Sequence, residues 1–206
     1  MRHSALVSVH PCHDLSAADW IQTSNQHWNQ LVTLGPPGYD AYARLRFIPD
    51  PTQPDQSEGD VPFDPGPDAP SENDQMRSAL TLLTAHTTTE RCYFAIWDGW
   101  GLLPTDKTTA RLQLPNRDYF LFHGAVTDLG NGEQWNRVLS GPAGAWPSGP
   151  DPAFVWPADR AWCLTKDVDP HYATIGASTA AIHALLEHPD LDVVPADLAE
   201  EPPRYL

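Results

Sequence analysis

The chain has little positive charge, and this scarcity excludes several classes of function. Its 206 residues include 12 lysines and arginines, only two of them lysine, against 27 aspartates and glutamates, so the formal net charge is −15. A surface this acidic repels phosphate backbones and anionic lipid headgroups, which argues against nucleic-acid binding and against attachment to acidic membranes. A basic protein partner is compatible with the charge, and solubility alone also accounts for it.

The sequence also lacks long apolar runs and a dense set of cysteines. No apolar stretch approaches the roughly 20 residues of a membrane span, and the stretch before His10 is too brief for a signal peptide. The three cysteines, Cys12, Cys92 and Cys163, cannot all pair, and the last two lie inside apolar runs where a thiol acts as a small hydrophobe. We therefore expect a cytoplasmic protein with free thiols.

Complete catalytic and cofactor motifs are missing too. No serine lies in a Gly-x-Ser-x-Gly turn, and residues 35–38 (Gly-Pro-Pro-Gly) have prolines where a phosphate-binding loop needs backbone N–H donors. Residues 10–13 (His-Pro-Cys-His) offer zinc donors, but no second pair stands at a suitable spacing. Asp167, Asp169 and His171 suit either a hard cation or the capping of a turn. The sequence predicts no cofactor and no metal site.

What is present predicts a single α+β domain over residues 1–206 with a mainly antiparallel sheet of five or six strands and two or three packed helices. Ser71 and Asp74 form a capping pattern before an apolar stripe that extends to Leu83, and Ser178 begins a second helix in which Leu186 is expected to face the core. Alternation over 44–48 places arginines on the wet face of a strand. The remaining strand candidates are the apolar runs at 92–97, 110–114, 119–122, 154–156, 161–164 and 191–194.

Three segments differ in composition from the rest. Residues 1–15 show no clear period, which predicts a loose N-terminal arm. Residues 49–70 contain seven prolines and six acidic residues with no lysine or arginine, which predicts a long, acidic, extended surface loop, either a docking strip or a tolerated insertion. Residues 196–206 form an acidic tail that we expect to be ordered by docking.

Several stretches of the chain resemble known families. Residues 154–163 (Phe-Val-Trp-Pro-Ala-Asp-Arg-Ala-Trp-Cys) and 92–101 (Cys-Tyr-Phe-Ala-Ile-Trp-Asp-Gly-Trp-Gly) resemble a family of uncharacterised actinobacterial proteins, which implies a shared fold and no known activity. A weaker similarity, over Trp28 and residues 35–39, is to SUKH-type immunity proteins, which are acidic α+β binding modules. The Asn-Gly-Gly-like turn that follows in that family is absent here.

Five residues at predicted strand ends and turns are the candidate binding site: Asp98, Trp100, Asp159, Asp167 and Asp169. Our first hypothesis is a non-enzymatic module of the antitoxin-like or regulatory kind that binds a protein partner through an acidic, aromatic face. The alternative is an enzyme or binding protein for a polar small molecule such as a sugar, with tryptophan as a stacking platform. A subunit of a larger assembly is a third possibility.

Overall fold

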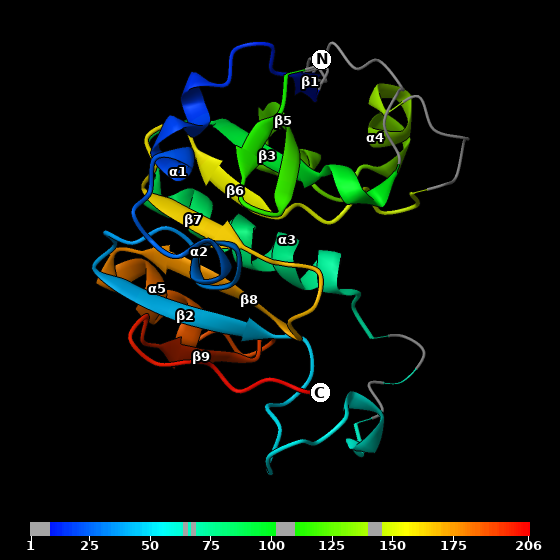
Figure 1. The fold of residues 1–206 in the computed structure, drawn as a ribbon, viewed down its shortest axis with the longest axis vertical. Coiled ribbons are helices and arrows are strands. Elements are labelled where there is room, and N and C mark those ends of the chain that lie inside the picture. The colour runs from blue at the N-terminus through cyan, green and yellow to red at the C-terminus, as the bar shows by residue number, and fades with distance from the viewer. Residues whose placement is uncertain (1–8, 64–65, 67–68, 102–109, 140–145) are drawn as a thin grey trace, which may run out of the picture.

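The computed structural model describes residues 9–63, 66, 69–101, 110–139 and 146–206, and one antiparallel sheet runs through them (Figure 1). The strand order is β1-β5-β3-β6-β7-β8-β2-β9, and β4 pairs with β5 beside β1. The strands are β1 (His10–Pro11), β2 (Ala41–Arg46), β3 (Arg91–Trp97), β4 (Leu112–Leu114), β5 (Arg117–Ala125), β6 (Phe154–Pro157), β7 (Trp162–Thr165), β8 (Tyr172–Ala177) and β9 (Val193–Ala196). The α+β class is confirmed, whereas the prediction of five or six strands is too low.

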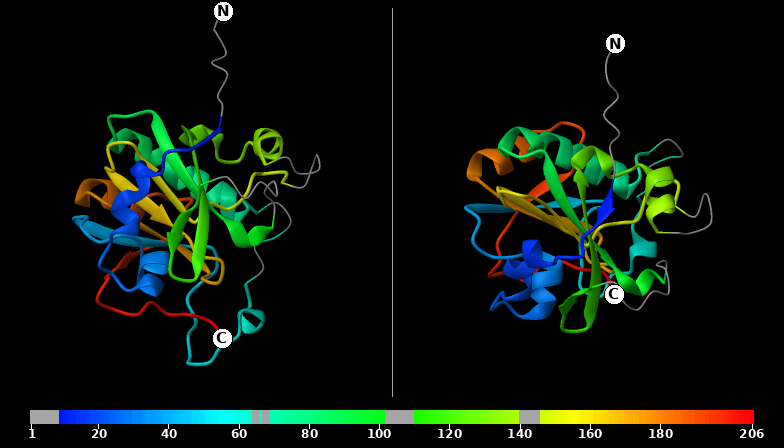
Figure 2. Two further views of the ribbon diagram at one scale, coloured as in Figure 1. Left: turned by 45° about the horizontal axis from the view of Figure 1, so that its top comes forward. Right: turned by 90° about the horizontal axis from the view of Figure 1, so that it is seen from above.

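Helices cover both faces of the sheet (Figure 2). One face packs against α3 (Glu72–Leu83), α4 (Gly132–Val138) and α5 (Thr179–Leu186), and the other against α1 (Asp19–Gln22) and α2 (Trp28–Leu34). The sequence predicts two or three helices and gives no sign of α4, because α4 lies in a Gly- and Pro-rich stretch that resembles a loop. Since each face is apolar, the sheet contributes to two separate hydrophobic clusters.

The sequence of the central strand β3 shows why helices cover both faces of the sheet. Its apolar run is continuous, as is typical of a strand covered on both sides. Phe94 and Ile96 belong to the hydrophobic cluster on the face covered by α3. Ala95 between them belongs to the cluster on the face covered by α1, and all three residues are buried. The helix after Ser71 also forms as predicted: the Ser71 side chain accepts from the Asp74 backbone N–H, and the apolar stripe Met76, Ala79, Leu80 and Leu83 is fully buried.

The structure corrects other expectations. Strand β8 was not predicted, because Ala173, Gly176 and Ala177 are poor strand formers on their own. Gly176 is needed there, since a Cβ would approach the Tyr39 ring to 2.5 Å. Leu186 is 37% exposed and does not face the core, and Arg44 is buried although the wet face of β2 was expected for it.

Both ends of the described chain are hydrogen-bonded to other segments of the protein. Residues 1–8 of the expected loose arm lie outside the described residues, but β1 pairs with β5 and the Cys12 backbone N–H donates to the Leu121 carbonyl at 2.7 Å. At the other end, the Leu206 backbone N–H donates to the Gln56 carbonyl at 3.1 Å. The tail and the acidic Pro-rich loop, of which residues 64–65 and 67–68 are not described, therefore lie side by side (Figure 1).

Candidate functional site

The strand register separates the five predicted site residues. Asp98 directly follows β3, and Asp167 and Asp169 follow β7, so all three lie at the same end of the sheet. Asp159 follows β6, which is antiparallel to β3, and the neighbouring Ala158 backbone N–H donates to the carbonyl of Arg91 at the opposite end. The five residues thus do not form one cluster.

The carboxylate of Asp159 is engaged in hydrogen bonds within the protein. Its carboxylate accepts hydrogen bonds from the Thr87 hydroxyl at 2.8 Å and from the Thr88 backbone N–H and hydroxyl at 2.8 and 2.9 Å. It also accepts from the Ala161 backbone N–H, so it ties residues 87–88 to the β6–β7 hairpin. With these bonds made, Asp159 has little capacity left for a ligand.

Asp98 lines a small hollow of about 390 Å³ together with Trp97, Gly99 and the β4–β5 turn. Asp98 accepts from the Arg111 guanidinium at 2.9 Å. Trp100 is 37% exposed, and its ring meets those of Trp97 and Trp146 edge to face at 5.8 and 5.9 Å. The aromatic rings are thus packed on one another more than they are presented to solvent.

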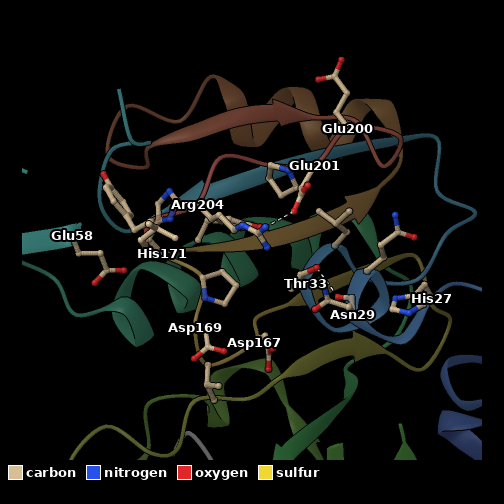
Figure 3. A pocket seen from close by; sticks show the side chains of 18 of the residues that line it. His27, Asn29, Thr33, Glu58, Asp167, Asp169, His171, Glu200, Glu201 and Arg204 are labelled. Atoms are coloured by element: carbon tan, nitrogen blue, oxygen red, sulfur yellow. Dashed lines mark hydrogen bonds and ion pairs between the residues drawn. The ribbon is translucent and has the colours of Figure 1, made fainter. Parts of the chain in front are cut away.

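Asp167 and Asp169 line a larger groove of about 980 Å³, which we call the acidic groove (Figure 3). Its walls are α2, residues 167–172, residues 57–58 and the segment 199–206. The two carboxylates differ: Asp167 is 6% exposed and paired through both oxygens with Arg117 at 3.2 Å, whereas Asp169 is exposed. Arg117 also reaches the small hollow, with its guanidinium 5.2 Å from the centre of the Trp97 ring, so it connects the two sites.

Carboxylates dominate the charged lining of the acidic groove. In the described part of the chain, Glu58, Asp169 and Glu200 have no hydrogen bond or ion pair through their carboxylates. Arg204, which lies across the groove in Figure 3, is paired with Glu201 at 3.1 Å. The uncompensated charge of the groove is therefore negative.

Beneath one wall of the groove, a cluster centred on Asp50 holds several segments together. Asp50 accepts from Arg44 at 2.6 and 2.9 Å, from Arg46 at 3.0 Å, and is 3.0 Å from His171 Nε2. Arg46 also pairs with Asp192, which precedes β9. Burial opposes ionisation of Asp50, but the hydrogen bonds from Arg44, His171 and Arg46 outweigh it and hold its pKa well below the usual range.

His171 belongs both to the cluster centred on Asp50 and to the lining of the acidic groove. The residue is 4% exposed, and its ring lies edge to face with Tyr172 and Tyr205, at 5.2 and 4.8 Å. This arrangement has only a weak signal in the sequence, because Glu58, His171 and Glu200 come from three distant segments. The pairing of β8 with β2 places His171 beside the end of β2, and the contacts of Tyr205 with His171 and of Leu206 with Gln56 bring the C-terminal segment back to it.

The thiols offer no nucleophile. All three cysteines are free and buried, and burial raises the pKa of Cys12 to about 11 and those of Cys92 and Cys163 to about 12. Thiols with such pKa values stay protonated at neutral pH and are unreactive. Within the described ranges, no group of three or more His, Cys, Asp or Glu side chains is arranged to hold a metal ion.

No helix among the described residues has the length and apolar character to cross a membrane. Comparison with protein families, with curated proteins and with solved structures gives no match for this chain. The case for a function therefore depends on the geometry and charge of the acidic groove.

Proposed function

We propose that the protein is a non-enzymatic binding module, of the antitoxin-like or regulatory kind, whose acidic groove takes a basic segment of a protein partner. The observation that carries this proposal is the set of carboxylates without an ion pair at Glu58, Asp169 and Glu200, gathered around one concavity. Complementary charge attracts such a partner over distance and discriminates against acidic ones. Of the residues predicted from sequence, Asp169 is the one best placed to contact the partner.

The partner's basic side chains would compensate charge that the protein itself leaves uncompensated. Asp167 contributes in another way, because its pairing with Arg117 fixes the chain that presents Asp169. Asp98 borders the neighbouring hollow, which Arg117 joins to the groove, and Trp100 packs against Trp97 beside it, so the two residues extend the same face for a longer partner. Asp159 lies at the opposite end of the sheet and is left out of the proposed contact.

The test uses a short fluorescein-labelled peptide of alternating arginine and glycine, with binding followed by fluorescence anisotropy at low and high salt. Neutralising Glu58 and Asp169 together (Glu58→Gln, Asp169→Asn) should weaken binding about ten-fold at low salt. The matched control neutralises two exposed carboxylates away from the groove, Asp40→Asn and Glu90→Gln, and so changes the net charge equally.

The control variant distinguishes binding at the acidic groove from attraction by the overall negative charge of the protein. If the Asp40 and Glu90 variant weakens binding as much as the groove variant, the peptide is held by the overall negative charge and the groove proposal fails. If only the groove variant weakens binding, and high salt reduces the affinity of the wild-type protein, the proposal is supported.

A second candidate is a binding protein or enzyme for a polar small molecule such as a sugar. It is favoured by the concavity, since about 980 Å³ is at the upper end of the range of small-molecule sites and Tyr172 and Tyr205 add aromatic lining. Screening sugars by thermal shift tests it, with Asp169→Asn as the comparison. A ligand that stabilises the wild-type protein but not this variant would favour the small molecule over the peptide.

A further inference from the structure

One wall of the acidic groove is formed by the protein's own segment 199–206, which forms no helix or strand. Two residues fasten it: the Tyr205 hydroxyl donates to the Pro49 carbonyl, and the Leu206 backbone N–H donates to the Gln56 carbonyl. The Tyr205 ring lies against His171. These hydrogen bonds to the rest of the protein lie at the end of the segment.

The charge of this segment does not suit the place it occupies. Glu200 and Glu201 lie in a groove whose other walls already carry Glu58, Asp167 and Asp169. The one cation of the segment, Arg204, pairs with Glu201 of the same segment. Like charges in proximity repel, so the electrostatic interaction favours replacement of this segment by a basic one.

The contacts of the segment also show which chemical groups can bind at this wall of the groove. An aromatic ring fits against His171, and two backbone carbonyls, those of Pro49 and Gln56, accept hydrogen bonds from a hydroxyl and an N–H group. The guanidinium of Arg204, directly before the aromatic residue in sequence, lines the groove and pairs with Glu201 (Figure 3). An extended chain with arginine next to an aromatic residue can make the same contacts.

We propose that the segment 199–206 is an internal competitor for the acidic groove, displaced by a partner segment that carries an arginine next to an aromatic residue. This inference rests on the proposed function and adds the chemistry of the partner and a means of regulating access. A partner that needs the place of this wall segment binds more weakly, in proportion to the fraction of molecules in which the segment has left its place. Loosening Tyr205 should therefore strengthen binding in trans.

The first measurement uses a labelled peptide of sequence Pro-Pro-Arg-Tyr-Leu and the full chain. Tyr205→Ala should raise the affinity for this peptide about ten-fold, and Tyr205→Phe, which keeps the ring, should raise it less. Combining Tyr205→Ala with the Glu58→Gln and Asp169→Asn changes should remove the gain. A control peptide with alanine in place of arginine and tyrosine should bind neither protein.

The second measurement follows displacement directly in the wild-type protein by heteronuclear NMR. On addition of the peptide, the Leu206 amide should exchange faster with solvent, while the Arg46 amide, which donates to the Asp192 carbonyl at the β2–β9 edge, should not change. Slower exchange at Leu206, or weaker binding by Tyr205→Ala, would identify the segment as part of the binding surface and overturn the competitor proposal.

The two proposals fail in different ways. If the arginine–glycine peptide binds through Glu58 and Asp169 but Tyr205→Ala changes nothing and Leu206 stays protected, only the internal competitor is refuted. If neither peptide binds the wild-type protein or the Tyr205→Ala variant, the groove is not a site for basic segments and both proposals are refuted.

Discussion

At the scale of single residues, Asp167 and Asp169 show how neighbouring carboxylates acquire different roles. Asp167→Ala leaves the Arg117 guanidinium, which is itself largely buried, without its partner, and we expect it to lower the free energy of unfolding by about 3 kcal/mol. Asp169→Ala removes an exposed, unpaired carboxylate and should change it by less than about 0.5 kcal/mol. Urea denaturation of both variants measures this, and equal effects would contradict the assigned roles.

Asp50 should make stability depend on pH in the acid range. Because hydrogen bonds from Arg44, His171 and Arg46 lower its folded pKa despite the opposing effect of burial, its ionised form stabilises the native state above the unfolded pKa, near 4. This contribution is lost as the pH falls below about 4 toward the folded pKa. Asp50→Asn should therefore destabilise by about 3 kcal/mol at pH 7 and by progressively less below pH 4.

Urea titrations of the wild-type protein and Asp50→Asn at several pH values measure this difference. A difference in the free energy of unfolding that stays constant from pH 7 to pH 3 would show that the charge of Asp50 is not what stabilises the cluster. Glu90→Gln, which removes an exposed carboxylate away from the cluster, serves as the comparison and should show no such trend.

The candidate site could be predicted only in part from these residues. The sequence places Asp98, Asp167 and Asp169 after strands, and the structure puts all three at one end of the sheet. It gives no sign that Asp159 is engaged by Thr87 and Thr88, because those hydrogen bonds span more than 70 residues of chain. Whether a carboxylate is available to a ligand depends on tertiary neighbours, which composition and spacing do not specify.

At the scale of elements, α3 allows a direct test of a sequence signal. Ser71→Ala removes the side chain that accepts from the Asp74 backbone N–H, and we expect a loss of about 1 kcal/mol in the free energy of unfolding. Ser78→Ala is the matched control, because that hydroxyl donates to the Asp74 carbonyl within the helix and is exposed. Thermal or urea denaturation should show a clearly larger effect at Ser71.

Elements with a strong local pattern were predictable, and elements defined by their neighbours were not. The cap at Ser71 and the apolar run of β3 identify their structures within a few residues of sequence. Strand β8 consists largely of small residues, and it forms because β7 and β2 pair with its two edges and Tyr39 and Tyr42 pack over Gly176. Such a strand has no signature of its own in the sequence.

At the scale of the whole molecule, the two apolar clusters share one sheet, so they should unfold together. Leu80→Ala on one face and Ile21→Ala on the other should each destabilise by about 2 to 5 kcal/mol and should shift a single transition. Calorimetry and circular dichroism test this prediction. Two separate transitions, each sensitive to only one of these changes, would show that the faces are independent.

The position of β2 has a consequence for how the chain folds. This strand pairs with β8 and β9, so contacts such as that between Arg46 and Asp192 join residues 146 positions apart. Sheets dominated by such distant pairings fold slowly, since much of the loop-closure entropy is lost before the contacts form. During synthesis β2 stays unpaired, with Ala43 and Leu45 exposed, until β8 and β9 have emerged from the ribosome. The acidic, proline-rich residues that follow it are unable to extend an intermolecular sheet, and they would protect the nascent chain from aggregation during that wait.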